Sequence, residues 1–458
     1  MKFRKFGKAL LISAVSVGAV FSLSSCVQSY TVGFLYVTGT QTSGKSGQGI
    51  VSGFKIDHNT GELHAIHGLP VASGGPNPGR AVLVSGSRFL YVLNQGVDAS
   101  GGSNCTSVTH PCTGANVSLF TVGGNGSLSV QPLQFSSQGY NPFRLLKDNS
   151  DGYLFVLDHD APDSGNGSSS NSCSLALGSG VTTCGDVTIF KVDPTTGRLS
   201  LVINAQVTSA SGQPLPYFPV PHDPIDMILA NGYLITLSGN PTDGDIVFPY
   251  SYSNGQLTIS QNGAQSLNIT QATAIQSGNG FVYVLDNEPL TIASGGSSVF
   301  NPGTYPAQIL PFSVGSGGSL QAQTGGAVPI DPSQSNPLFL LATSGSKWVY
   351  VADTGDNQNQ NNPQSGIVGY TIDKATQQLT PMSGSPFGST IGIGAGPQCL
   401  VEDPSNQFMY TANFNSSSVT GVSIDQNNGV LRQLPGKAAR SFALPGPASY
   451  CVVDPRTS

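Results

Sequence analysis

The residues best suited to chemistry are charged side chains that share one slot of a recurring strand. Three such residues each lie two positions after a proline that opens the strand: Arg80, Arg144 and Asp226. Guanidinium groups bind carboxylates and phosphates through paired hydrogen bonds, so two arginines beside one aspartate could hold an anionic ligand. The same three residues could instead neutralise one another, and their spacing leaves both interpretations open.

Two histidines have acidic neighbours in comparable positions. His159 lies between two aspartates, and His222 directly precedes Asp223. Hydrolysis of an ester needs a base that activates water and a donor that stabilises the oxyanion, and an arginine of the first set could be that donor. The candidate catalytic residues are therefore His159, His222 and Asp226. Alternatively, both histidines are solvated loop residues without a chemical role.

A second polar set follows strands that share an aromatic and aliphatic pattern. Its members are predicted to join Arg80 and Arg144 in contacting a ligand: Asn94, Asp158, Glu288 and Asp353. Calcium prefers several carboxylate oxygens, so Asp286, Glu288 and Asp353 could in principle form a calcium site, although they lack EF-hand spacing. No cofactor or metal is predicted, and the glycine-rich segments lack the helix that follows a phosphate-binding loop.

The elements that must position these residues are repeated. One strand pattern occurs seven times, as FLYV (34–37), FLYV (89–92), YLFV (153–156), YLIT (233–236), FVYV (281–284), WVYV (348–351) and FMYT (408–411). Each copy is followed by a hairpin with alternating apolar residues, and several of its turns, such as Asn-Thr-Gly at 59–61, tolerate positive φ. Most copies are preceded by a strand that begins with proline. The repeats therefore predict about four antiparallel strands per unit.

A four-stranded sheet of this size cannot bury both of its faces, so the units must stack, and radial stacking leaves no long exposed edge. The first unit lacks a Pro-led strand, whereas the chain ends with one, at residues 447–455. We predict that this last strand completes the first unit. The fold class is therefore all-β, a seven-bladed β-propeller closed by N- and C-terminal strands in one blade, in preference to a pair of β-sandwiches.

Several of these repeats resemble a known family. Residues 34–66, FLYVTGTQTSGKSGQGIVSGFKIDHNTGELHAI, are similar to the opening of the lactonase-type seven-bladed propellers, which include bacterial 6-phosphogluconolactonases and carboxymuconate-cyclase-like proteins. TIFKVDPTTGRLSLV (188–202), GYTIDKATQQLTPM (369–382) and VEDPSNQFMYTAN (401–413) extend the match, and the Tyr-Val repeats resemble the YVTN repeat of surface-layer proteins. The family's enzymes carry Gly-Pro-Arg-His where their innermost strands begin. Here no histidine occupies the matching slots.

The start of the chain has the pattern of a bacterial export signal. Four basic residues precede the apolar run 9–21, and Leu-Ser-Ser-Cys at 23–26 resembles a lipobox. We predict a signal peptide at 1–25, lipidation of Cys26, a tether at 26–33 and the propeller at 34–458. The alternative is an ordinary signal peptide with a cysteine near its cleavage site. The protein is thus expected outside the cytoplasm, periplasmic or on the cell surface, and lipid-anchored to a membrane.

Composition limits the other partners. With 18 basic and 24 acidic residues among 458, the net charge is −6, and 9% of the residues are charged, which argues against a nucleic-acid partner. Six cysteines remain after Cys26, and an even number in an oxidising compartment favours disulfides over a zinc site. Two local pairs are predicted, Cys105 with Cys112 and Cys173 with Cys184, and a bond between Cys399 and Cys451 would join the last two repeats.

Two functions follow from these features. The first is hydrolysis of a lactone, or of a related small anionic sugar derivative, at the mouth of the channel. The second is non-catalytic binding of a small molecule, a carbohydrate or a protein at the cell envelope, on the polar insertions 95–115, 160–185 and 285–305.

Overall fold

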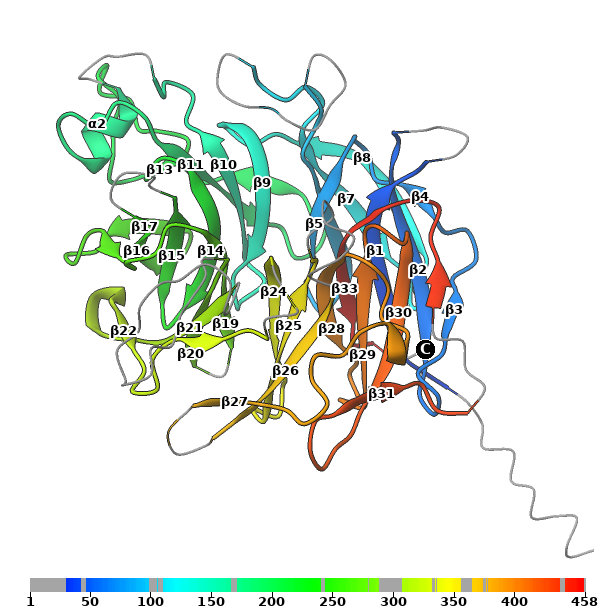
Figure 1. The fold of residues 1–458 in the computed structure, drawn as a ribbon. Coiled ribbons are helices and arrows are strands. Elements are labelled where there is room, and N and C mark those ends of the chain that lie inside the picture. Colours follow the sequence, from blue (N-terminus) through cyan, green and yellow to red (C-terminus); the bar gives the residue numbers. More distant parts are fainter. Residues whose placement is uncertain are drawn as a thin grey trace, which may run out of the picture.

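The computed structural model describes residues 30–42, 47–98, 105, 110–165, 171–239, 244–278, 280–287, 307–331, 334, 336–355, 365–373, 376, 378–436 and 441–456. Almost all of the regular secondary structure in these residues lies in seven antiparallel sheets (Figure 1). Their innermost strands contact one another in cyclic order, from the first blade through the seventh and back. The predicted seven-bladed β-propeller is therefore confirmed.

The first four blades, each written from the innermost strand outward, contain the following strands. Blade one has β33 (Ala448–Asp454), β1 (Thr31–Thr40), β2 (Gly49–Asp57) and β3 (Leu63–Ala65), with β4 (Val71–Ala72) beside β2. Blade two has β5 (Pro78–Val84), β6 (Phe89–Asn94), β7 (Asn116–Val122) and β8 (Leu128–Phe135). Blade three has β9 (Tyr140–Lys147), β10 (Tyr153–Asp160), β11 (Gly185–Val192) and β12 (Leu199–Leu201), with β13 (Phe218–Val220) beside β11. Blade four has β14 (Pro224–Ala230), β15 (Tyr233–Ser238), β16 (Ile246–Ser253) and β17 (Gln256–Ile259), with β18 (Gln265–Ser266) beside β16.

The remaining three blades repeat this order. Blade five has β19 (Ala272–Gly278), β20 (Phe281–Asp286), β21 (Gln308–Val314) and β22 (Leu320–Ala322), with β23 (Val328–Pro329) beside β21. Blade six has β24 (Pro337–Ala342), β25 (Trp348–Asp353), β26 (Gly366–Ile372) and β27 (Leu379–Pro381). Blade seven has β28 (Pro397–Glu402), β29 (Phe408–Asn413), β30 (Ser418–Ile424) and β31 (Leu431–Gln433), with β32 (Ser441–Ala443) beside β30. The short helices are α2 (Ser172–Leu177), η1 (Ser316–Gly318) and η2 (Ser389–Ile391). Within the described part of the chain, no helix combines the length and apolarity needed to cross a bilayer.

The repeated strand pattern is explained by contacts between neighbouring blades. At six interfaces, the aromatic residue that opens the repeated pattern of the second strand packs against a positive-φ glycine in the outer turn of the next blade. The pairs are Phe34 with Gly126, Phe89 with Gly197, Tyr153 with Gly255, Tyr233 with Gly318, Trp348 with Gly429 and Phe408 with Gly61. A Cβ atom at Gly197 would lie 2.7 Å from Cδ1 of Phe89, so the ring requires glycine there. The aromatic residue and the turn glycine of the next blade therefore form one unit.

Tyrosines two positions further along reinforce this contact. Their hydroxyl groups donate hydrogen bonds to the carbonyl oxygens of the same glycines: Tyr36 to Gly126, Tyr91 to Gly197, Tyr350 to Gly429 and Tyr410 to Gly61. Buried tyrosines need such a partner, because an unpaired hydroxyl costs free energy in an apolar core. An apolar cluster fills the space between every pair of adjacent blades. This burial on both faces explains the continuous apolar runs of the second strands.

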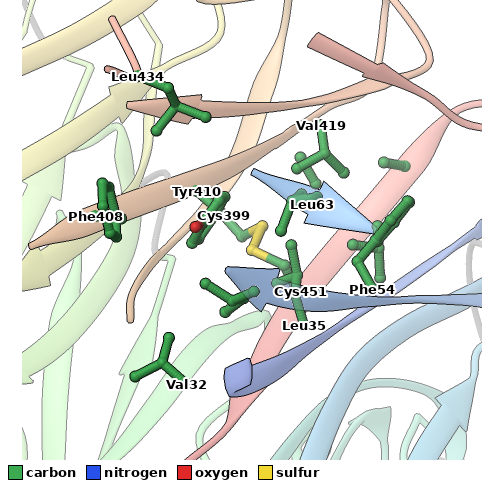
Figure 2. Close-up of a cluster of buried hydrophobic side chains, with 14 residues drawn as sticks. Val32, Leu35, Phe54, Leu63, Cys399, Phe408, Tyr410, Val419, Leu434 and Cys451 are labelled. Atoms are coloured by element: carbon green, nitrogen blue, oxygen red, sulfur yellow. A yellow bond between two sulfur atoms is a disulfide. The ribbon is translucent and has the colours of Figure 1, made fainter. Parts of the chain in front are cut away.

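The two ends of the described chain close the ring, as predicted. Strand β33 pairs antiparallel with β1, with Phe34 opposite Asp454 and Val37 opposite Cys451. Figure 2 shows the closing interface, where Leu35 and Phe54 of blade one lie in the same cluster as Tyr410 of blade seven. The C-terminal strand therefore forms the innermost strand of blade one.

Three disulfides are present, Cys105–Cys112, Cys173–Cys184 and Cys399–Cys451, with Cα–Cα distances of 5.2, 5.5 and 5.9 Å. The predicted pairings are confirmed, but the position of the third bond differs from the prediction. Cys399 lies in blade seven and Cys451 in the strand that completes blade one, so the bond joins the last blade to the first (Figure 2). Three disulfides are typical of a protein located outside the cytoplasm.

The contact between aromatic ring and glycine can be tested with a matched pair of substitutions. Gly197→Ala should lower the free energy of unfolding by about 1–2 kcal/mol through its positive φ and by about 1–3 kcal/mol more through the clash with Phe89. Gly232→Ala is the control, because Gly232 also has a positive φ but a Cβ atom added there would meet no other atom within 4 Å. Denaturant titration of both variants measures the difference, and equal losses would contradict the proposed role of the contact.

Candidate functional site

The charged residues of the innermost strands meet in the central channel. The Nε atom of Arg144 on β9 lies 3.1 Å from Oδ1 of Asp226 on β14, and Nη2 of Arg80 on β5 lies 3.6 Å from Oδ2 of the same carboxylate. The Asp226 side chain is 3% exposed, whereas those of Arg80 and Arg144 are 17% and 24% exposed. The prediction that these three residues lie together is therefore confirmed, as is their mutual pairing.

A recurring irregularity aims these side chains into the channel. In every blade, the pairing of the innermost strand with the second strand shifts register near the start of the innermost strand, as between Pro78 and Ala81 or between Pro224 and Asp226. A β-bulge changes the direction of the side chains beside it. The direction of the side chain two positions after the proline is thus determined by the bulge, and its position around the channel is determined by the repeat.

Other groups hold Asp226 in place. Its Oδ1 accepts a hydrogen bond from the backbone N–H of Met227 at 3.0 Å, and its Oδ2 lies 3.4 Å from the N–H of Ile275 and 3.5 Å from Nε2 of Gln276. The carboxylate therefore has a fixed orientation between the two arginines. Burial lowers the pKa of Arg144, while the charge of Asp226 opposes that shift. Arginine remains a cation under these conditions, so the cluster carries a net positive charge.

Aromatic side chains complete the cluster. The guanidinium carbon of Arg80 lies 4.8 Å from the ring centre of Tyr450 on β33 and 5.7 Å from that of Phe339 on β24. Tyr450 also lies within hydrogen-bond distance of Arg80, with 3.5 Å between its hydroxyl and Nη1. The sequence prediction missed Tyr450 and Gln276, because both lie outside the slot two positions after proline that held the charged residues.

Two cavities lie on opposite sides of this cluster, and both are lined by Arg80, Arg144 and Tyr450. The smaller, about 220 Å³, lies near the starts of the innermost strands and includes Asn77 and Gln398. The larger, about 550 Å³, extends towards the other ends of these strands and is also lined by Asp226. Small-molecule pockets typically measure about 300–1,000 Å³, so the larger cavity has the volume of a complete ligand site.

The predicted histidines lie nearer the mouth, outside the cluster. His159 is exposed as a whole residue, but one face of its ring is covered by Phe143, with ring centres 3.8 Å apart, and Phe143 in turn lines the smaller cavity. Desolvation of the ring and then the charge of Arg144 lower the pKa of His159, which is therefore neutral at pH 7. Nδ1 of His222 lies 2.9 Å from the Asp223 carboxylate, and the His222 side chain is 40% exposed. Neither histidine touches Asp226 through any hydrogen bond found among the described residues.

The described members of the second polar set lie inside the blades instead of facing the channel. Asn94, Asp158 and Asp353 are each 0% exposed. The amide of Asn94 donates to the carbonyl oxygen of Ser73 and to Oδ1 of Asn116, and Oδ1 of Asp353 accepts from the N–H of Gly355. These side chains satisfy the polar groups of loops at the blade ends, and their role in contacting a ligand stays a prediction.

The predicted signal peptide at 1–25, the lipidated Cys26 and the ligand residue Glu288 all lie outside the described residues. The calcium hypothesis depended on Glu288 together with Asp286 and Asp353. Oδ2 of Asp286 accepts a hydrogen bond from Nε2 of Gln308 at 2.7 Å. Across the described ranges, no three histidine, cysteine or acidic side chains are grouped closely enough to hold a metal ion.

Blade three contains a buried pair of acidic residues that the sequence prediction did not identify. Asp158 and Asp186 lie opposite each other on β10 and β11, and both are 0% exposed. Burial raises the pKa of Asp158 to about 8, and burial together with the neighbouring carboxylate raises that of Asp186 well above its usual range. Blade two has Asn94 opposite Asn116 in the same positions, so uncharged amides fit this site.

The fold and the channel together define the class of protein, a seven-bladed β-propeller with a positively charged centre. Residues 321–450 match the family model described as "Lactonase, 7-bladed beta-propeller". The predicted resemblance to the lactonase-type propellers is thereby confirmed. No curated protein sequence matches the chain significantly.

Solved structures with the same fold include a candidate 6-phosphogluconolactonase from Bacteroides fragilis, at 14% identity and a TM-score of 0.59, covering 92% of this chain and 98% of that one. A periplasmic gluconolactonase from Pseudomonas aeruginosa is 16% identical, with a TM-score of 0.58 and coverage of 92% and 99%. At such low identity these similarities establish the shared propeller fold.

The acidic pair leads to a prediction about pH. Because the folded-state pKa of Asp158 is above its unfolded value, the folded protein binds more protons, and stability should fall as the pH rises from about 4 to about 8. Asp186→Asn removes one carboxyl group and should flatten this pH dependence and raise the melting temperature at pH 8 by a few degrees. Thermal unfolding of both proteins from pH 5 to 8 measures the effect. An unchanged pH dependence would show that this acidic pair does not cause the loss of stability with rising pH.

Proposed function

We propose that the protein binds a small anionic ligand in the channel and hydrolyses a lactone, such as a sugar-derived lactone, at that site. The observation that carries the proposal is that Arg80 and Arg144 share one carboxylate, that of Asp226, in a largely buried cluster. A desolvated positive charge is costly unless an anion compensates it. A bound carboxylate, or the oxyanion formed during ester hydrolysis, would supply that compensation.

The cluster also contains the groups that the reaction requires. In the proposed mechanism, the carboxylate of Asp226 accepts a proton from a water molecule as the water attacks the lactone carbonyl carbon. The guanidinium groups of Arg80 and Arg144 donate hydrogen bonds to the carbonyl oxygen as negative charge develops there. Collapse of the intermediate breaks the ring C–O bond, and the proton held by Asp226 passes to the alkoxide. His159 and His222 remain alternative bases at the mouth.

The family match over residues 321–450 and the fold shared with the periplasmic gluconolactonase from P. aeruginosa support a lactone as the substrate class. The departure from the Gly-Pro-Arg-His pattern favours the alternative, a propeller that binds its ligand without turnover. In that case the same arginines bind an anion, and Asp226 only orients them. Measuring turnover and binding separately distinguishes the two functions.

The first experiment assays the purified protein against a panel of lactones, including glucono-δ-lactone, by titrating the acid released. Asp226→Asn should lower kcat by about 10²–10⁴-fold, the usual range for loss of a general base. Asp425→Asn is the matched control, since Asp425 pairs with Arg432 on the outer part of blade seven. Loss of activity in His159→Ala or His222→Ala, with Asp226→Asn active, would assign the base to a histidine. The absence of turnover on every lactone of the panel would leave the binding function.

We also propose that the protein is exported and anchored to a membrane through Cys26. Support comes from the basic and apolar segments before this cysteine and from the three disulfides. Cells given a labelled fatty acid should incorporate label into the wild-type protein, and Cys26→Ser should abolish labelling and release the protein into the soluble extracytoplasmic fraction. Equal labelling of both proteins would contradict lipidation at this residue.

A further inference from the structure

The two cavities beside the arginine cluster differ in chemical character. The smaller is lined by amide and hydroxyl groups, including those of Asn77, Gln95, Gln398 and Ser449. The larger is walled next to the cluster mainly by aliphatic side chains, including Val82, Leu146, Leu229 and Val452. The positively charged layer therefore separates the smaller chamber, here called the polar chamber, from a larger chamber whose wall is mainly aliphatic next to the cluster and polar at its outer end.

We propose that the larger chamber binds the hydrocarbon chain of an amphiphilic carboxylate, or of the matching acyl-substituted lactone, whose polar head contacts Arg80 and Arg144. This inference rests on the proposed anion site and narrows its ligand class. An aliphatic wall gives no partner to the hydroxyl groups of a polyol, and each unpaired hydroxyl loses the hydrogen bonds that it made in water. A hydrocarbon chain gains free energy from the same wall.

The charges of this chamber agree with an anionic head group at its inner end. Five charged residues line the chamber: Arg80, Arg144, Lys147, Asp151 and Asp226. Lys147 forms an ion pair with Asp151, so their charges cancel, and Asp226 compensates one of the two arginines. The remaining positive charge belongs to the arginine cluster, where the aliphatic walls begin.

The dimensions and the opening also fit such a ligand. The chamber of about 550 Å³ accommodates a medium-length chain, whereas the polar chamber of about 220 Å³ is smaller than most ligand pockets. Its outer end is lined by polar residues that include the exposed Asn149 and Ser277. A hydrocarbon chain can therefore enter from the face on which the innermost and second strands of blades two to seven are joined.

The proposal is tested by calorimetric titration of the purified protein with straight-chain carboxylates from acetate to octanoate. Affinity should rise about three- to fourfold for each added methylene group, since every buried CH₂ contributes a similar increment. Octanol, with the same chain and no charge, should bind at least tenfold more weakly than octanoate. An affinity that stays constant from acetate to octanoate, or octanol binding as tightly as octanoate, would overturn the proposal.

Matched variants test where the hydrocarbon chain of the ligand binds. Leu146→Gln places an amide in the aliphatic wall and should reduce the gain per methylene group, whereas Leu338→Gln alters the polar chamber and should leave that gain unchanged. Circular dichroism and melting temperature establish that both variants fold. If both substitutions changed the gain in affinity per methylene group equally, the hydrocarbon chain would not bind in the larger chamber. Binding of gluconate but not octanoate would overturn this inference while leaving the proposed function intact. Binding of octanoate without turnover of any lactone would support this inference and contradict the proposed lactone hydrolysis.

Discussion

The architecture depends on the packing of an aromatic ring against a glycine turn in the next blade. No blade can bury its own two faces, and at six interfaces the second strand is stabilised through the turn of the next blade. The glycine allows both the positive φ of the turn and the close approach of the ring, and the tyrosine two positions later bonds the same carbonyl group. The contact has a direction, from each blade to the next, and it returns to Gly61 of blade one from Phe408 and Tyr410 of blade seven.

Closure of the ring also creates the candidate site. Arg80, Arg144 and Asp226 come from three successive blades, and Tyr450 comes from the strand that completes the circle. The disulfide between Cys399 and Cys451 holds that strand to blade seven, one residue away from Tyr450. The stability of the closing interface is thus linked to the position of an aromatic side chain beside Arg80. The cluster also separates the smaller cavity from the larger cavity with its partly aliphatic wall, and this difference is the basis of the ligand class that we propose.

The sequence predicted the fold and the charged cluster for the same reason. Repeated units place equivalent residues at equal radius and height, so residues in one slot of successive innermost strands must converge. That reasoning did not give the direction of the Asn94, Asp158 and Asp353 side chains, because equivalence places residues together without showing which way they face. These side chains lie inside the blades, bonded to polar groups of the blade ends. The same reasoning also missed Tyr450 and Gln276, because neither residue lies two positions after a proline that opens an innermost strand.

The sequence by itself determined the number of blades, the pairing of the first and last strands, and the arc on which Arg80, Arg144 and Asp226 lie. These features are encoded by local patterns that recur, and recurrence has one geometric solution. Only the tertiary structure decided that two arginines share one carboxylate, that His159 stacks on Phe143 outside this cluster, and that aliphatic walls lie on one side of it. The physical reason is that burial and charge pairing depend on distances between side chains of different blades, which no single repeat contains.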